Sequence, residues 1–330
     1  MSEEVCAMAN IFKTTLKNNF ISIPFIIAAF AALFAGGFDV VFYIVDYDGH
    51  PFSASRLMES HMPTYLAFLI AALPPLLTGR EFVGGTIRNK LITGTTKTGF
   101  FISQLLVNSA ITVIIAMLYF LPTFIFCTKY YDHFQPYMVF YAIVFILLGY
   151  LVITAISTVI SVMSDRMIVS MVASLLLLFI FVFVDSWLGN SLSQPKYQEG
   201  FDQVYYEGGI EFESNEYDEE YQEYQGSQDE KYKDYNPYYV KSKAQRAFMQ
   251  TARHLIPFEI IGNGTAMIEE QLVSMDMYRQ SKKEAAKHAD DYPVFQERVE
   301  SLFWVPVYSI SFIAVLTALG LFLFKRRNIK

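Results

Sequence analysis

The segment Arg80–Thr98, which reads REFVGGTIRNKLITGTTKT, has residue types and spacing that suit a defined contact with another protein. Gly84 and Gly85 break the preceding helix, and Thr86 is a residue type that favours the N-cap of a new helix. Gly94 is a natural C-terminal stop for that helix. The pattern predicts a short helix held between glycine hinges.

Inside this predicted helix, Ile87 and Leu91 are four residues apart and therefore share one face. The other faces carry the polar and basic residues Arg88, Asn89 and Lys90. A helix this short is not stable alone. It makes sense if it fits a groove on another protein. An ordinary positively charged loop at a membrane surface would show the same composition, and this alternative stays open on the residues alone.

The sequence carries no set of residues typical of catalysis. It contains no G-x-x-x-x-G-K-[ST], no H-E-x-x-H and no G-x-S-x-G motif. The five histidines are scattered between hydrophobic runs, so a metal site is not indicated. Asp39 and Asp185 lie near the ends of apolar runs and are expected to reach the outer interface rather than to form a proton relay. We expect a chain that is not an enzyme and binds no metal or cofactor itself.

The elements that would position the docking helix are long apolar runs. Of the 330 residues, 53% are hydrophobic and only 17% are charged, which is too few charges for a soluble domain of this size. A membrane span needs about 20 mostly apolar residues. The predicted fold is an all-α polytopic membrane protein with six transmembrane helices, at Ile21–Val45, Pro63–Leu77, Phe100–Cys127, Tyr137–Met163, Met167–Leu188 and Leu302–Phe324. The second run contains Pro74-Pro75, so we expect it to be kinked and packed inside the bundle.

The charge distribution predicts the orientation. Lys and Arg in short loops stay cytoplasmic, and they gather around residues 13–17, 80–97 and 325–330. We therefore expect both termini to be cytoplasmic. The predicted parts are an amphipathic interfacial helix (1–20), helices 1 to 5 with the docking helix at 84–94 (21–188), an extracellular segment (189–301), and helix 6 with a basic tail (302–330).

Residues Glu4–Phe20 show helical spacing of apolar residues, with Lys13 and Lys17 on the other side. This pattern predicts an amphipathic helix in the inner membrane interface. A cleaved signal peptide ending near residues 29–31 is the alternative. It is disfavoured because the apolar run continues to Val45.

The extracellular segment divides into two parts. Residues 195–239 are acidic and rich in tyrosine, with few aliphatic residues to make a core, so disorder is the default expectation. Residues 240–300 have helical spacing and apolar stretches too short to span. These suit short helices that rest on, or dip into, the outer leaflet.

The run from Glu81 to Leu91, followed by Gly94 and Lys97, resembles the signature of ABC type-2 permeases, the membrane subunits of ABC exporters. In that family an acidic residue ends the second span, and a Gly-Thr pair opens a short coupling helix. The resemblance extends to the amphipathic N-terminal helix, the six spans and the short outer helices. The long acidic insertion departs from the family, and its role is not implied by the resemblance.

The resemblance implies that two permeases pair across a two-fold axis, as two copies or with a related permease. Two separate ATPase subunits, which hold ATP and Mg, would bind underneath. The implied ATPase-coupling residues are Glu81, Gly85, Thr86, Ile87, Arg88, Asn89, Lys90 and Leu91. Arg88 and Lys90 would meet acidic groups of the ATPase, and Glu81 would pair with Arg80 or Arg88.

The implied substrate route runs along the first, second and fifth spans. Candidate lining residues are Phe25, Phe30, Phe38, Tyr65, Phe68, Phe179 and Phe183. This lining is apolar, which favours export of a hydrophobic or amphipathic substrate such as a peptide, toxin or antimicrobial peptide. The acidic segment 195–239 would draw cationic peptides towards the outer face.

Two alternatives remain open on the sequence. The same machinery could move a lipid, a drug or sodium. A protein of another class, a membrane sensor or immunity scaffold, could bind a ligand with its outer segment. A scaffold, however, has no need for a hinged docking helix. No feature of the sequence points to nucleic acid.

Overall fold

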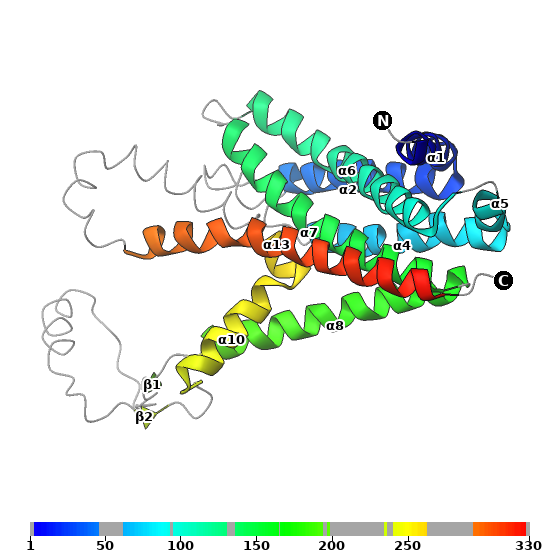
Figure 1. The fold of residues 1–330 in the computed structure, drawn as a ribbon. Helices are drawn as coiled ribbons and strands as arrows, with labels where there is room; N and C mark the ends of the chain where they lie inside the picture. The colour runs from blue at the N-terminus through cyan, green and yellow to red at the C-terminus, as the bar shows by residue number, and fades with distance from the viewer. Residues whose placement is uncertain are drawn as a thin grey trace, which may run out of the picture. The chain divides into compact units, whose positions relative to one another are not determined.

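The computed structural model describes residues 3–45, 62–92, 95–130, 136–164, 166–193, 197–198, 234–235, 240–262 and 293–327 (Figure 1). The acidic segment 195–239, except for two short strands, lies outside the described residues. Gly94 and most of 263–300 lie outside them too. The predictions made for these residues therefore stay predictions.

Each predicted span corresponds to a helix. In the part of the chain that the structure describes, the six long helices are α2 (Ile23–Val45), α4 (Met62–Val83), α6 (Lys97–Tyr130), α7 (Pro136–Met163), α8 (Met167–Ser193) and α13 (Pro293–Arg326). Five of them are long and apolar enough to cross a membrane alone. The sixth, α4, meets this test together with the short helix α5 (Thr86–Ile92), from which it is bent by 64°. The protein is thus an all-α polytopic membrane protein.

Helices α6 and α7 form the centre of the bundle. Helix α2 packs on α6 and α4, while α4 and α13 pack on α7. The apolar stretch of α7 is 67% buried and that of α6 is 50% buried, against 28% for α2 and 17% for both α8 and α13. The last three helices therefore present most of their apolar surface outward, as lipid-facing helices do.

Glycines let the helices approach closely at two contacts of the bundle. A Cβ atom placed on Gly36 of α2 would lie 2.0 Å from the carbonyl oxygen of Tyr119 in α6. One placed on Gly320 of α13 would lie 2.6 Å from the ring of Phe101. Small residues at such crossings are a common source of helix association in membranes.

Helix α4 is buried although it contains a proline pair. Pro74 and Pro75 lie within its continuous run, and Ile70, Ala71 and Leu77 around them are at most 1% exposed. The Ser161 hydroxyl of α7 donates to the carbonyl of Pro74 at 3.2 Å. The prediction that this segment is packed inside the bundle is confirmed.

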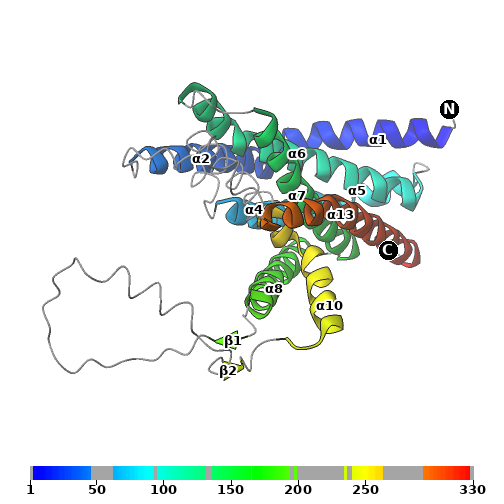
Figure 2. The same cartoon turned by 90° about the vertical axis from the view of Figure 1, so that its left-hand side faces the viewer.

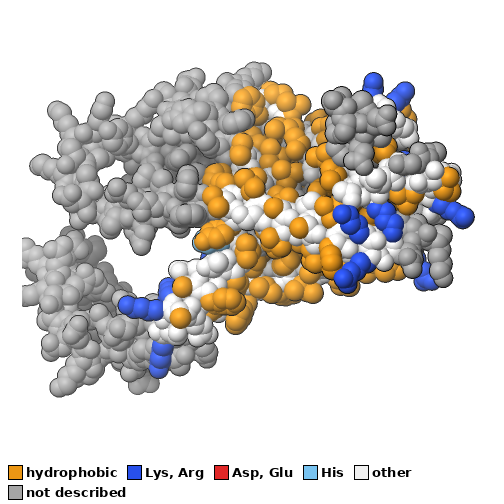
Figure 3. All heavy atoms as spheres, viewed as in Figure 1, with side chains coloured by type: hydrophobic (Ala, Val, Ile, Leu, Met, Phe, Trp, Pro, Cys, Tyr) orange, Lys and Arg blue, Asp and Glu red, His pale blue; other side chains and the backbone are white. Residues whose placement is uncertain are grey.

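The two ends of the chain lie at the same end of the bundle, close to α5, in both views (Figures 1 and 2). The first helix, α1 (Glu3–Phe20), packs on α6 at this end. On the face seen in Figure 3, hydrophobic side chains cover the middle of the helices, and Lys and Arg side chains lie at the end with α1, α5 and the C-terminus and also over α10. This distribution agrees with the charge bias of the sequence.

Residues Ser186–Thr251 form a second compact unit. It contains the end of α8, most of α10 (Lys243–His254) and an antiparallel pair of two-residue strands, β1 (Tyr197–Gln198) and β2 (Asp234–Tyr235). These strands join the two ends of the acidic segment.

Residues 252–262 belong to the bundle rather than to the second unit. A short helical stretch at 257–262 places Ile260, which is 1% exposed, in a cluster with Phe145, Val152 and Ile156 of α7. This stretch packs among the spans, whereas the sequence predicts short helices that rest on, or dip into, the outer leaflet.

Candidate functional site

The hinge between α4 and α5 is built by two glycines. The amide of Gly84 donates to the carbonyl of Arg80 at 2.9 Å, and the amide of Gly85 donates to that of Phe82 at 3.1 Å, which closes the last turn of α4. Gly85 has a φ of 66°, a left-handed conformation that residues with a Cβ adopt only at a cost. Its carbonyl accepts from the amide of Asn89 at 3.3 Å, so the N-cap is Gly85 rather than the predicted Thr86.

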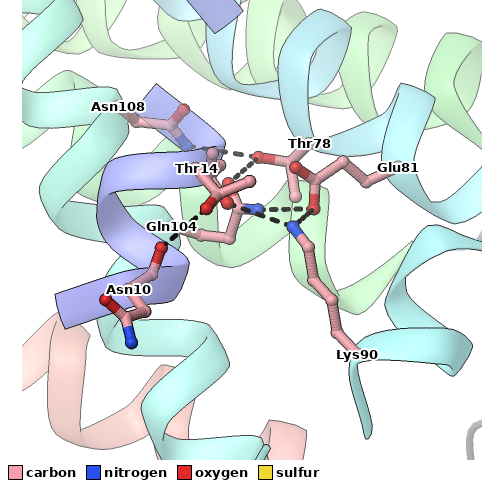
Figure 4. A network of polar contacts seen from close by, with 8 residues as sticks. Asn10, Thr14, Thr78, Glu81, Lys90, Gln104 and Asn108 are labelled. Atoms are coloured by element: carbon pink, nitrogen blue, oxygen red, sulfur yellow. Dashed lines mark hydrogen bonds and ion pairs between the residues drawn. The ribbon is translucent and has the colours of Figure 1, made fainter. Parts of the chain in front are cut away.

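An ion pair spans this hinge. The Lys90 ammonium on α5 lies 2.9 Å from the Glu81 carboxylate at the end of α4 (Figure 4). The side-chain amide of Gln104 in α6 donates to the same carboxylate oxygen at 2.8 Å. The two charged side chains are only 18% and 11% exposed, respectively, so their attraction is less screened than at an open surface. Glu81 therefore pairs with Lys90 rather than with Arg80 or Arg88.

The same lysine also reaches the N-terminal helix. Its ammonium donates to the Thr15 hydroxyl of α1 at 3.0 Å and lies 5.7 Å from the centre of the Phe100 ring in α6. Thr15 and Asn19 are 0% and 1% exposed, so α1 turns a polar face towards the chain. Lys90 thus joins four helices: α1, α4, α5 and α6.

Polar contacts continue from Glu81 into the bundle. The Thr78 hydroxyl donates to Gln104 at 3.4 Å and accepts from the Asn108 amide at 3.3 Å (Figure 4). Asn108 also donates to Thr158 of α7 at 3.0 Å. The side chains of Thr78, Gln104, Asn108 and Thr158 are at most 2% exposed. Lys90 of α5 is therefore linked, through Glu81, to a chain of hydrogen bonds inside α4, α6 and α7.

The apolar face of α5 packs against its own chain. Ile87 is 1% exposed and lies in a cluster with Phe100, Phe101, Val162 and Phe324, against which Leu91 also packs. Because the chain itself covers this apolar face, a groove on another protein would meet the other faces of α5. Spacing shows which residues share a face, but it does not show what covers the face.

The surface that α5 turns outward is polar, with one apolar residue at its end. Thr86, Arg88 and Asn89 are exposed, and Ile92 is 72% exposed. A contact with another protein through α5 would use these residues. Lys90, which the resemblance placed in such a contact, is committed to Glu81 inside the chain.

The structure brings together only part of the predicted substrate-path set. The rings of Phe68 and Phe179 lie 4.9 Å apart. Phe25 is buried against Phe20 at 4.8 Å, at the start of α2. The remaining candidates have exposures of 70%, 46%, 61% and 73%: Phe30, Phe38, Tyr65 and Phe183.

Two acidic residues of the spans have partners within the bundle. Asp39 is 8% exposed and accepts a hydrogen bond from the Tyr119 hydroxyl at 2.5 Å. Asp185 lies 3.3 Å from Arg253, which also contacts Glu259 at 2.6 Å. These ion pairs tie the start of the 252–262 stretch to α8.

Next to this ion pair, His254 stacks on Tyr308 of α13, with 6.0 Å between ring centres. Burial, and secondarily the neighbouring Arg253, lower the pKa of His254 below its usual range. Within the part of the chain that the structure describes, His, Cys, Asp and Glu form no group of three or more that could hold a metal.

Sequence reasoning missed Thr15, Gln104 and Asn108. Each lies in an apolar or amphipathic run and resembles an isolated polar residue there. A signal was present in the helical spacing of Gln104, Asn108 and Thr112, which places three polar residues on one face of α6.

Comparison with known protein families gives a match. The family model described as ABC-2 family transporter protein matches residues 76–329, which include α5 and every long helix after α4. No curated protein matches the chain.

Proposed function

The chain belongs to the ABC-2 transporter family and is a multi-pass permease subunit of an ABC transporter, and from this premise we propose that α5 is its coupling helix. ATP hydrolysis takes place on a separate ATPase subunit, which holds ATP and Mg. The observation that carries the proposal is the hinged α5 with Thr86, Arg88, Asn89 and Ile92 turned outward. Arg88 would meet acidic groups of the ATPase.

Movement of the ATPase would reach the spans through two routes. One is the ion pair between Lys90 and Glu81, continued by Gln104 and Thr78 into the bundle. The other is the apolar cluster around Ile87, which rests on α6 and α13. Since both routes are buried contacts, a displacement of α5 has to be followed by the helices that it touches.

The end of the bundle with α5 and both termini would be cytoplasmic, in a bacterial plasma membrane. The gathering of Lys and Arg at this end supports this orientation (Figure 3). A second copy, or a related permease, would complete the transporter across a two-fold axis.

The cargo would be a hydrophobic or amphipathic molecule moved outward, with a peptide, toxin or antimicrobial peptide as the best candidate. Exposed aromatic residues on α2 and α8 support an apolar route, among them Phe30, Phe38, Phe179 and Phe183. The acidic segment 195–239 would attract cationic peptides. Deleting it should reduce export of a cationic amphipathic peptide, and unchanged export would remove that role.

The test of the coupling proposal is a pull-down in detergent from cells that express the chain with its genomic neighbours, followed by an ATPase assay. The native chain should capture a P-loop ATPase. Arg88→Glu should abolish the capture, whereas Arg166→Glu, an exposed arginine between α7 and α8, should retain it. Capture of no ATPase by the native chain would contradict the proposal.

A further inference from the structure

Arg327, directly after α13, contacts the ends of three other helices. Its guanidinium donates to the carbonyl of Val162 near the end of α7. It also lies over the Phe82 ring near the end of α4, 5.0 Å from the ring centre. Its own carbonyl accepts from the ammonium of Lys97, the first residue of α6, at 2.6 Å. One residue therefore ties α13 to α4, α6 and α7.

Two of these helix ends flank α5. Helix α4 ends at Val83, α5 runs from Thr86 to Ile92, and α6 begins at Lys97. Phe324, in the last turn of α13, is fully buried in the cluster that holds Ile87 of α5. The end of α13 thus supports α5 through this cluster and holds the helices on both sides of α5 through Arg327.

Farther along, α13 touches the outer segment. Ile260 packs in a cluster with Phe312, Ile313 and Leu316 of α13. Helix α13 therefore packs in the cluster that holds Ile260 and, at its end, in the cluster that holds Ile87 of α5. A rigid helix with a contact at each place can carry a displacement from one to the other.

We infer that Arg327 is a positioning residue for coupling. It holds the end of α13 against the helix ends and the apolar cluster that contact α5, so that movements of α5 and of residues 256–261 are linked. This inference rests on the proposed function of α5. The contacts suit the role, because the guanidinium both donates to Val162 and lies over the Phe82 ring, and hydrogen bonds from charged groups are stronger than neutral ones.

The first test uses the purified full chain in detergent and needs no ATPase. Amide hydrogen exchange at 86–92 should be about tenfold faster in Arg327→Ala than in the native chain, the effect expected from one lost charge-assisted bond. Arg326→Ala is the matched control, because Arg326 stacks on Phe322 of its own helix. Arg327→Lys should restore part of the protection. Equal exchange at 86–92 in the two alanine variants would overturn the inference. Exchange that is faster along the whole chain of Arg327→Ala would overturn it too.

The second test uses the complex with the ATPase, trapped with Mg, ATP and vanadate. Trapping should change exchange at 86–92 and at 256–261 in the native chain and in Arg326→Ala. In Arg327→Ala the change at 86–92 should remain, and the change at 256–261 should be lost. A retained response at 256–261 would overturn the inference. Failure of the native chain to bind an ATPase would instead count against the proposed function. The first test would still show whether Arg327 stabilises α5.

Discussion

Lys90 of α5 reaches back across the glycine hinge to Glu81 of α4, with 2.9 Å between its ammonium nitrogen and the carboxylate oxygen. The pair joins two residues that are nine positions apart in the sequence, across a bend of 64° between the two helices. Because Lys90 also bonds to Thr15 and Glu81 also bonds to Gln104, the pair fixes α5 to three helices at once. The orientation of α5 is therefore set by side chains as well as by the hinge.

Removing one member of this pair should loosen α5. Lys90→Met leaves the Glu81 carboxylate poorly exposed and without its cation, and we expect a loss of about 1–3 kcal/mol in stability. Thermal unfolding in detergent should show a lower midpoint than for Arg88→Met, which changes an exposed residue. The double variant Glu81→Gln with Lys90→Met should lose less than the sum of the two single variants. Additive losses would show that the two charges do not interact.

Substitution of the two isoleucines of α5 should affect two different properties, the stability of the chain and its binding to the ATPase. Ile87→Ala creates a cavity in the cluster around Phe100 and Phe324 and should cost about 2–4 kcal/mol of stability. Ile92→Ala changes a residue that is 72% exposed, so stability should stay the same while ATPase capture weakens. Unfolding midpoints and capture yields measured on the same preparations check both. The reverse pattern would mean that the two faces of α5 are assigned the wrong way round.

The sequence predicts much of this site, but not which face of α5 is buried against the chain. The glycine pair and the helical spacing of Ile87 and Leu91 place α5 within a residue or two of its observed bounds, and the apolar runs place all six long helices. The pairing of Glu81 with Lys90 depends on a 64° turn that propensities do not specify. The cluster that holds Ile87 and Phe324 joins residues far apart in the chain, and helical periodicity carries no information about such packing.

Gly85 should tolerate substitution poorly. With a φ of 66°, an alanine there should cost about 1–2 kcal/mol. Gly85→Asn should cost less than Gly85→Ala, because asparagine adopts left-handed conformations more readily. Local hydrogen exchange at 86–92 measures the loosening. If alanine and asparagine behaved alike and like the native chain, the left-handed hinge would be contradicted.

Gly36 and Gly37 form a matched pair for the contact between α2 and α6. A Cβ on Gly36 would meet the backbone oxygen of Tyr119 at 2.0 Å, whereas a Cβ on Gly37 would meet nothing within 4 Å. Gly36→Ala should therefore force the helices apart at a cost of about 1–3 kcal/mol. Gly37→Ala should be neutral or slightly stabilising, since alanine favours helices. Unfolding midpoints that are equal for the two variants would contradict this packing.

The most direct test of the central claim, that the outward face of α5 binds the ATPase, is site-specific photo-crosslinking in cells. A benzophenone amino acid at Ile92 should crosslink to a P-loop ATPase encoded nearby. The same group at Phe248 of α10, which is 73% exposed and thus as accessible as Ile92, should not. A crosslink from residue 92 that disappears with Arg88→Glu is the predicted result. No crosslink from residue 92, or an ATPase crosslink from residue 248 alone, would contradict the assignment of α5 as the coupling helix.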